Sequence, residues 1–145
     1  MRRAAANWYG EITRVWYHGA MPPYERFMAW RHCHELALAV YRISRRFPPE
    51  ERFGLVSQAR RAAFSAAANI VEGSAKRGRA EFRRFVDISI GSLAELAYIL
   101  RFTSDLGMLR ETDARALGRL HEEASKTTWG LYKSLASRNS PPRSG

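Results

Sequence analysis

Residues 54–73 constrain the fold of this chain more than any other stretch, because they have the pattern of one long helix made largely of alanine. Polar residues recur in it at spacings of seven, four and three, which places them on one stripe of a helix. The small side chains beside that stripe allow a neighbouring helix to come close. We therefore predict an inner helix that carries a polar stripe into a tight contact. The stripe comprises Gln58, Ser65, Asn69 and Glu72, with Glu95 and Arg61 as candidate charged partners.

A catalytic role for this stripe is one interpretation, but a structural role is favoured. Buried polar groups must find hydrogen-bond partners, and a satisfied network fixes the register of packed helices or subunits. Nothing in the sequence has the pattern of a nucleophile elbow, a phosphate-binding loop or a tuned carboxylate pair. We therefore predict no catalytic residue and no cofactor.

Apolar periodicity typical of an amphipathic helix covers about residues 24–46. Pro48 and Pro49 end it, because proline cannot continue the helical hydrogen-bond ladder. The alanine-rich helix follows, and Gly73 is its candidate C-cap.

Two further helices are predicted after a basic connection. One covers about residues 79–105 and ends at Gly107. Gly91 in its interior lowers helix stability, so we expect another backbone to pass close to it. The last helix begins near Thr112, a candidate N-cap, with Asp113 in its first turn.

The fold class is therefore all-α. Four helices of about 20 residues with short connections describe an antiparallel up-down-up-down four-helix bundle, which we place at residues 25–137. Residues 138–145 have the composition of a disordered tail. The apolar surface exceeds what one small bundle needs, so we expect a homo-oligomer.

Residues 1–24 form an N-terminal extension that is partly ordered at most. Its glycines and prolines limit any helix to about residues 11–17. Two interpretations stay open: a segment that docks on the bundle or on a neighbouring subunit, and a disordered leader.

The formal net charge of +10 is the strongest compositional signal. It favours a polyanionic partner, with nucleic acid first and an anionic membrane surface second. A soluble basic protein without such a partner is the alternative. No pattern for reading base edges is present, so we expect sequence-independent, salt-sensitive binding to phosphates. The candidate nucleic-acid-binding residues are Arg60, Arg61, Lys76, Arg77, Arg79, Arg83 and Arg84.

The single cysteine, Cys33, excludes an internal disulfide and is predicted to be a buried thiol. Metal binding by Cys33 with its neighbours His32 and His34 is disfavoured, because adjacent helical positions point about 100° apart. No run of 18 apolar residues suggests a membrane span. We expect a cytoplasmic protein.

Several short motifs stand together in an order that resembles a known family. They are F-x-x-W (Phe27, Trp30), F-P-x-E (Phe47, Pro48, Glu50), G-L-x-x-Q-x-R-R-A (Gly54, Leu55, Gln58, Arg60, Arg61, Ala62), S-x-x-x-N-I-x-E-G (Ser65, Asn69, Ile70, Glu72, Gly73), E-F-x-R-F (Glu81, Phe82, Arg84, Phe85) and G-S-x-x-E-L (Gly91, Ser92, Glu95, Leu96).

Over about residues 26–135 the chain resembles the four-helix bundle proteins encoded in intervening sequences of bacterial 23S rRNA genes. That family includes the accessory variability determinant (Avd) protein of diversity-generating retroelements. The resemblance implies a homo-oligomeric ring, a pentamer, with a basic surface. In the retroelement branch such a ring binds a reverse transcriptase and nucleic acid. The first 24 residues have no counterpart in the resemblance.

From the sequence we predict a non-enzymatic accessory protein that binds RNA or an RNA–DNA hybrid together with a partner such as a reverse transcriptase. A protein-interaction scaffold without nucleic-acid binding is the alternative. A third interpretation is a HEPN-like RNase, because Arg115 and His121 have a similar arginine–histidine spacing.

Overall fold

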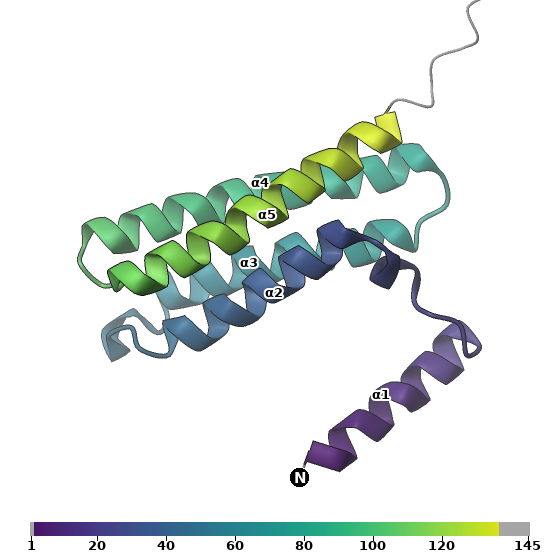
Figure 1. Cartoon of the computed structure of the whole chain (residues 1–145), viewed down its shortest axis with the longest axis horizontal. Helices are drawn as coiled ribbons and strands as arrows, with labels where there is room; N and C mark the ends of the chain where they lie inside the picture. The colour runs from purple at the N-terminus through teal and green to yellow at the C-terminus, as the bar shows by residue number, and fades with distance from the viewer. Residues whose placement is uncertain (1, 137–145) are drawn as a thin grey trace, which may run out of the picture.

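The computed structural model describes residues 2–136, with the side chains of residues 8–136 (Figure 1). Every regular element in that part of the chain is helical, which confirms the all-α class. The α-helices are α1 (Arg2–Tyr17), α2 (Met28–Ser44), α3 (Leu55–Ser74), α4 (Arg79–Asp105) and α5 (Glu111–Ala136), with short 3-10 turns η1 (Pro23–Arg26) and η2 (Pro49–Glu51).

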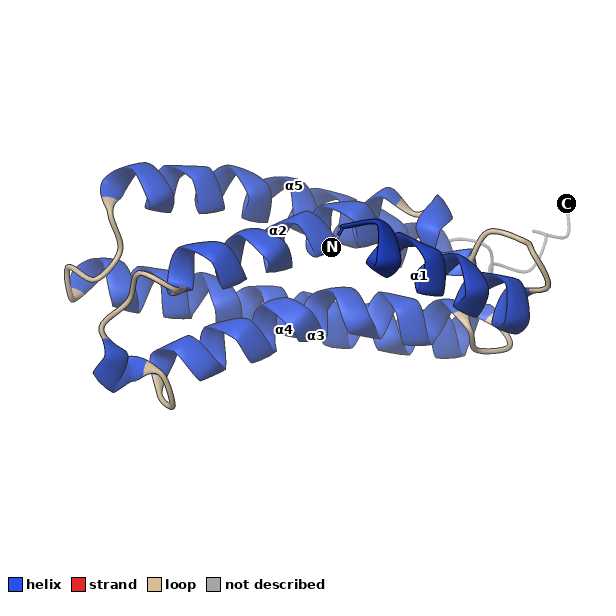
Figure 2. Cartoon of the chain, turned by 90° about the horizontal axis from the view of Figure 1, so that it is seen from below, coloured by secondary structure: helices blue, strands red, loops and turns tan. Residues whose placement is uncertain are grey.

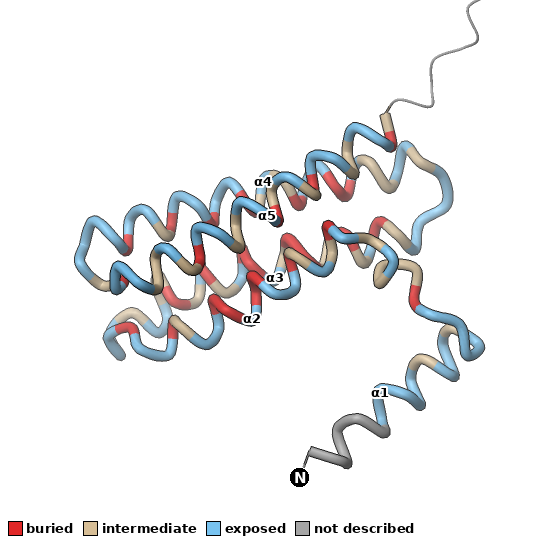
Figure 3. Tube along the Cα trace, in the orientation of Figure 1, coloured by how far each residue is buried: buried red, intermediate tan, exposed pale blue. Residues whose placement is uncertain are grey.

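Helices α2 to α5 lie side by side along the long axis of the molecule, and α1 stands apart from them (Figures 1 and 2). Helix α2 packs against α3 and α5, and α4 packs against the same two helices. The buried residues lie along the faces that these four helices turn toward one another (Figure 3). None of the helices within residues 2–136 is long and apolar enough to cross a membrane.

The alanines of α3 pack in the core against α4. Ala63 and Ala66 are fully buried beside Ile70, and the hydroxyl of Ser89 in α4 donates to the carbonyl oxygen of Ala66 at 2.8 Å. The alanine face of α3 therefore makes a close helix contact, as predicted, but α3 is not an inner helix, because Phe64 and Arg61 on its other side are exposed. Small side chains let the α4 backbone approach, and larger residues from the other helices fill the remaining space. These residues are Leu36, Val86, Leu96 and Leu117.

Gly73 serves this close packing and does not cap α3, so the C-cap prediction was wrong. Helix α3 continues to Ser74, and Ala75 is its cap residue. A Cβ atom on Gly73 would lie 2.8 Å from a ring carbon of Phe82 and 2.8 Å from the Cβ of Phe85. Glycine is needed because α4 begins directly against the last turn of α3.

The end of α4 follows the prediction. Gly107 has φ +73°, a left-handed conformation that glycine adopts without strain. The backbone N–H of Gly107 donates to Ser104, and that of Met108 donates to Thr103, as in a Schellman motif. We expected another backbone to pass close to Gly91, and within one chain this was wrong. A Cβ atom on Gly91 would meet nothing within 4 Å.

Two helix starts differ from the sequence-based prediction. Helix α2 begins at Met28 because residues 23–26 form the turn η1 instead of its first helical turn. Helix α5 begins at Glu111, because the carbonyl oxygen of Arg110 already accepts the N–H of Ala114. Thr112 therefore lies inside α5 and is not its N-cap. Asp113 does lie in the first turn, as predicted.

Helix α1 is longer than the predicted segment 11–17, because it continues through Gly10 to Arg2. One helical glycine costs only about 1 kcal/mol relative to alanine, and alanines precede it. The Tyr9 hydroxyl lies 2.9 Å from that of Tyr24 and donates to Glu25 at 2.7 Å, so the extension does contact the start of the bundle. The predicted disordered tail, 138–145, lies outside the described residues.

Candidate nucleic-acid interface

The connection between α3 and α4 places basic side chains at one end of the bundle. Gly78 has φ +90°, which lets the chain reverse direction and enter α4. Lys76 and Arg77 precede it and are both exposed. We call the exposed or half-buried cations of this connection and the first turns of α4 the turn surface. It comprises Lys76, Arg77, Arg79, Arg83 and Arg84.

Phe85 organises two of these cations. The Lys76 ammonium lies 5.5 Å from the centre of the Phe85 ring, and the Arg84 guanidinium lies 4.7 Å from it. Arg84 also pairs with Glu81 at 3.3 Å, but both side chains are more than half exposed. Exposed pairs of this kind contribute little stability, so Arg84 can exchange its partner for a phosphate.

Arg79 joins the turn surface to the end of α5. Its Nη2 donates to the carbonyl oxygen of Ser134 at 2.7 Å. Its Nε is buried and has no hydrogen-bond partner within the described residues. Arg79 therefore positions α4 against α5, and Lys133 of α5 lies next in sequence to its hydrogen-bond acceptor.

The structure does not bring Arg60 to the turn surface. Arg60 lies fourteen residues before the end of α3, which is roughly 20 Å along the helix. Its guanidinium donates to the Ser44 hydroxyl at 2.9 Å and to the Tyr41 carbonyl oxygen at 3.3 Å. It also lies over the Tyr41 ring at 4.8 Å. Arg60 therefore holds α3 against α2.

Arg61 is also far from the turn surface, and it lies beside part of the polar stripe. A groove of about 370 Å³ between α3 and α4 is lined by Gln58, Arg61, Ala62, Ser65, Ser92 and Glu95. Arg61 and Glu95 share this groove, but no ion pair joins them among the described residues.

The polar stripe divides into a bonded part and an exposed part. The hydroxyls of Ser65 and Ser92 lie 2.8 Å apart, and Asn69 Nδ2 donates to the Ser65 carbonyl oxygen at 2.9 Å and to its hydroxyl at 3.0 Å. Gln58, Glu72 and Glu95 are exposed. Within one chain the stripe is therefore only half-buried, at its centre.

His32, Cys33 and His34 meet different neighbours. His32 Nδ1 lies 3.2 Å from the Thr127 hydroxyl, Cys33 Sγ lies 3.5 Å from the Thr128 hydroxyl, and the His34 ring stacks on Trp30. Cys33 is fully buried, as predicted. Burial raises the pKa of its thiol to about 11, although the contact with Thr128 opposes this shift. Within residues 8–136 no His, Cys, Asp and Glu side chains group as metal ligands.

Arg115 and His121 of the arginine–histidine pattern have separate contacts. Arg115 is exposed and pairs with Glu111 one turn earlier. His121 Nε2 donates to the carbonyl oxygen of Leu93 in α4 at 2.7 Å, and its Nδ1 lies 3.4 Å from the Ser125 hydroxyl. The His121 ring thus helps α5 contact α4. The absence of enzyme activity stays a prediction.

Sequence reasoning missed a groove on α5, which we call the Trp129 groove. It has a volume of about 880 Å³ and is lined by Gly118, His121, Glu122, Ser125, Lys126, Trp129, Gly130 and Lys133. Trp129 is 47% exposed and packs edge-on against Tyr132. The available signal was a tryptophan with lysines three residues before and four after it, which shares a helix face with them.

A family comparison covers the bundle and not α1. The family model of the 23S rRNA-intervening sequence protein matches residues 25–130. The chain belongs to this family. The match confirms the resemblance drawn from the motifs, and it begins after α1. A comparison with curated proteins gave no significant match.

Proposed function

We propose that this family member is a non-enzymatic accessory protein that binds RNA or an RNA–DNA hybrid through phosphate contacts. It would hold the nucleic acid next to a partner such as the reverse transcriptase of a diversity-generating retroelement. The observation that carries the proposal is the turn surface, where five exposed or half-buried cations lie at one end of the bundle and only Arg84 has an acidic partner, Glu81, among the described residues. Lysine and arginine side chains in such a position contact phosphates without reading sequence.

The proposed assembly is an antiparallel four-helix bundle that forms a homo-oligomeric ring, a pentamer, in the cytoplasm. Cross-bundle contacts support opposite helix directions: Arg46 at the end of α2 pairs with Asp113 at the start of α5 at 2.6 Å. Exposed apolar side chains support contacts between subunits, because large exposed hydrophobic residues mark interaction surfaces when they cluster. They include the neighbouring pair Tyr98 and Phe102 of α4, whose ring centres lie 6.2 Å apart.

Charge reversal at the turn surface tests the proposal. The variant combines Lys76→Glu, Arg77→Glu and Arg83→Glu, and it leaves Arg79 in place because Arg79 anchors α4 to α5. We expect its affinity for a structured RNA at low salt to fall at least 100-fold, because several phosphate contacts become repulsive. Fluorescence anisotropy with labelled RNA measures the affinity, and circular dichroism checks the fold.

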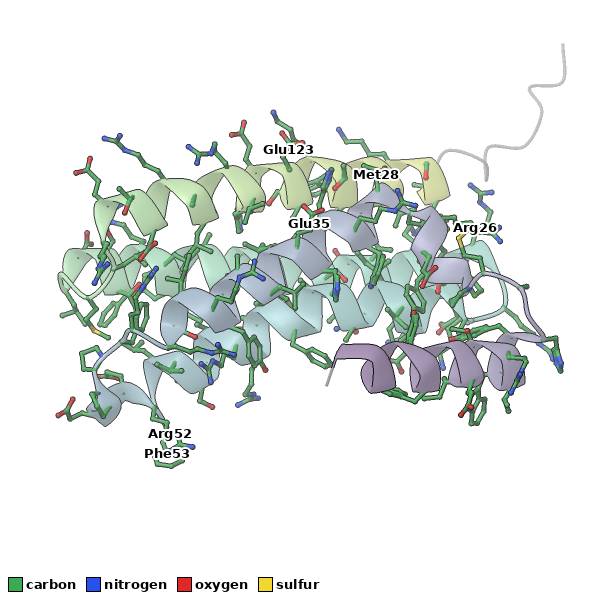
Figure 4. All side chains as sticks on the ribbon, turned by 60° about the horizontal axis from the view of Figure 1, so that its bottom comes forward. Arg26, Met28, Glu35, Arg52, Phe53 and Glu123 are labelled. Carbon is green, nitrogen blue, oxygen red and sulfur yellow. The ribbon has the colours of Figure 1, made fainter. Side chains whose placement is uncertain are left out.

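A matched control separates a local site from the effect of net charge. Arg42→Glu, Arg52→Glu and Arg110→Glu make the same change in charge at exposed positions near the opposite end of the bundle; Figure 4 shows Arg52 pointing away from the helices there. We expect this control to keep most of the affinity. Equal loss in both variants would contradict a site at the turn surface. No binding by the wild-type chain would favour the protein-interaction scaffold.

A further inference from the structure

The Trp129 groove combines an exposed aromatic face with cations at its edge. Trp129 stands on α5 with its indole half-exposed, and Lys126 and Lys133 line the same groove. Lys126 pairs with Glu122 at 3.0 Å, but both side chains are more than 60% exposed. Such a pair is weak and is screened by salt, so the Lys126 ammonium can contact an incoming anion.

Two glycines of α5 line the groove. A Cβ atom on Gly118 or on Gly130 would meet nothing within 4 Å, so neither glycine is explained by packing inside the chain. A smaller hollow between α4 and α5 adjoins the groove and shares His121, Ser125 and Trp129 with it. Open space from both the groove and the hollow therefore adjoins Trp129.

The groove and the turn surface lie near each other. Arg79 donates to the carbonyl oxygen of Ser134, next to Lys133. Arg83 lies on α4 seven residues, or about 10 Å, before Ile90, which lines the hollow beside Trp129. The turn surface and the Trp129 groove therefore lie toward the same end of the bundle, where the start of α4 meets the end of α5.

We propose that the Trp129 groove binds an unpaired base of a single-stranded nucleic acid, with Lys126 and Lys133 contacting the adjoining phosphates. This inference rests on the proposed function and adds a preference for single strands to it. Stacking on an aromatic side chain is available to every unpaired base, because each base has a π-face. Bases inside a duplex are already stacked and do not reach the indole.

The charge and shape of the groove favour a nucleotide over a second protein helix. An apolar helix would bury Lys133 and the Lys126–Glu122 pair against it, and burying charged groups in an apolar contact is costly. A nucleotide places its ring on the indole and its phosphates at the ammonium groups. The groove therefore offers a contact to the base and to the phosphates of the same nucleotide.

The test compares Trp129→Ala and Trp129→Phe with the wild-type chain. Affinities are measured for a single-stranded RNA without secondary structure and for a duplex of the same length. We expect Trp129→Ala to lower single-strand affinity about tenfold, since stacking contributes about 1–3 kcal/mol per base. Duplex affinity should change less than twofold, and Trp129→Phe should retain most single-strand binding.

Trp16→Ala is the matched control, because Trp16 is 74% exposed on α1 and lies outside the groove. It should leave both affinities unchanged. Equal effects of Trp129→Ala on single strand and duplex, or no effect on either, would overturn the inference while leaving the proposed function standing. A change in oligomeric mass in Trp129→Ala, measured by light scattering, would also overturn it, because the groove would then be a subunit contact. Absence of all binding by the wild-type chain would instead contradict the proposed function.

Discussion

Basic residues near the start of α3 and just beyond its end have different surroundings. Near its start, Arg60 donates to the Tyr41 carbonyl oxygen and to the Ser44 hydroxyl of α2. Beyond its end, Lys76 and Arg77 are exposed, and Lys76 contacts only the Phe85 ring face at 5.5 Å among the contacts described above. Both groups add to the same net charge, yet only the second belongs to the turn surface that we propose contacts a polyanion. The comparison shows that a basic residue is a candidate for phosphate binding only if its side chain is not already held by contacts inside the protein.

The largest effect on this comparison is expected from Gly73→Ala. The added Cβ atom would lie 2.8 Å from Phe82 and Phe85, so the end of α3 and the start of α4 must separate. Overpacking of this kind costs typically about 1–3 kcal/mol. We expect a lower melting temperature and weaker RNA binding, because the cations of the turn surface lose their fixed placement. Thermal unfolding followed by circular dichroism measures the first effect.

Gly91→Ala is the control for this substitution. Gly91 lies inside α4 in open space, and alanine is a better helix former than glycine by up to about 1 kcal/mol. We expect the melting temperature to stay the same or rise. A loss of stability equal to that of Gly73→Ala would show that the close approach at Gly73 is not the cause.

A smaller effect is expected from Arg60→Ala, which tests the other end of α3. Removing its contacts with Ser44 and Tyr41 should lower the free energy of unfolding by about 1 kcal/mol, since the hydrogen bonds lie at a half-buried position. RNA affinity should change less than twofold. Chemical denaturation measures the free energy of unfolding, and fluorescence anisotropy measures the RNA affinity. A loss of affinity as large as that caused by charge reversal at the turn surface would contradict the division proposed for α3.

The helices themselves follow closely from the sequence. Helix α4 has the predicted bounds, and α3 differs from its prediction by one residue at each end. Apolar periodicity carries this information, because burial of one face requires it. The role of Gly73 did not follow, because a glycine near a helix end suits a cap as well as a close contact. Only the position of Phe82 and Phe85 distinguishes the two.

The candidate site was less accessible to sequence reasoning. In the sequence Arg60 and Arg77 are both basic residues with no visible difference in role. Only the position of α2 shows that the Arg60 guanidinium already donates to the Tyr41 carbonyl oxygen. Apolar periodicity in α5 does not predict the role of Trp129, because the pattern identifies buried positions and Trp129 is 47% exposed. The burial of Gln58 and Glu72 was expected from a helix contact, yet both are exposed in one chain.

The central claim is that the basic surface binds nucleic-acid phosphates, and a salt titration of the wild-type chain tests it most directly. A single-stranded RNA and a duplex DNA are titrated at several salt concentrations, with protein samples of known oligomeric mass. We expect tight binding at low salt and a linear fall of log K with log salt concentration, by about 0.7 to 0.9 per phosphate contacted. Absence of binding at low salt, or an affinity that does not change with salt, would contradict the account.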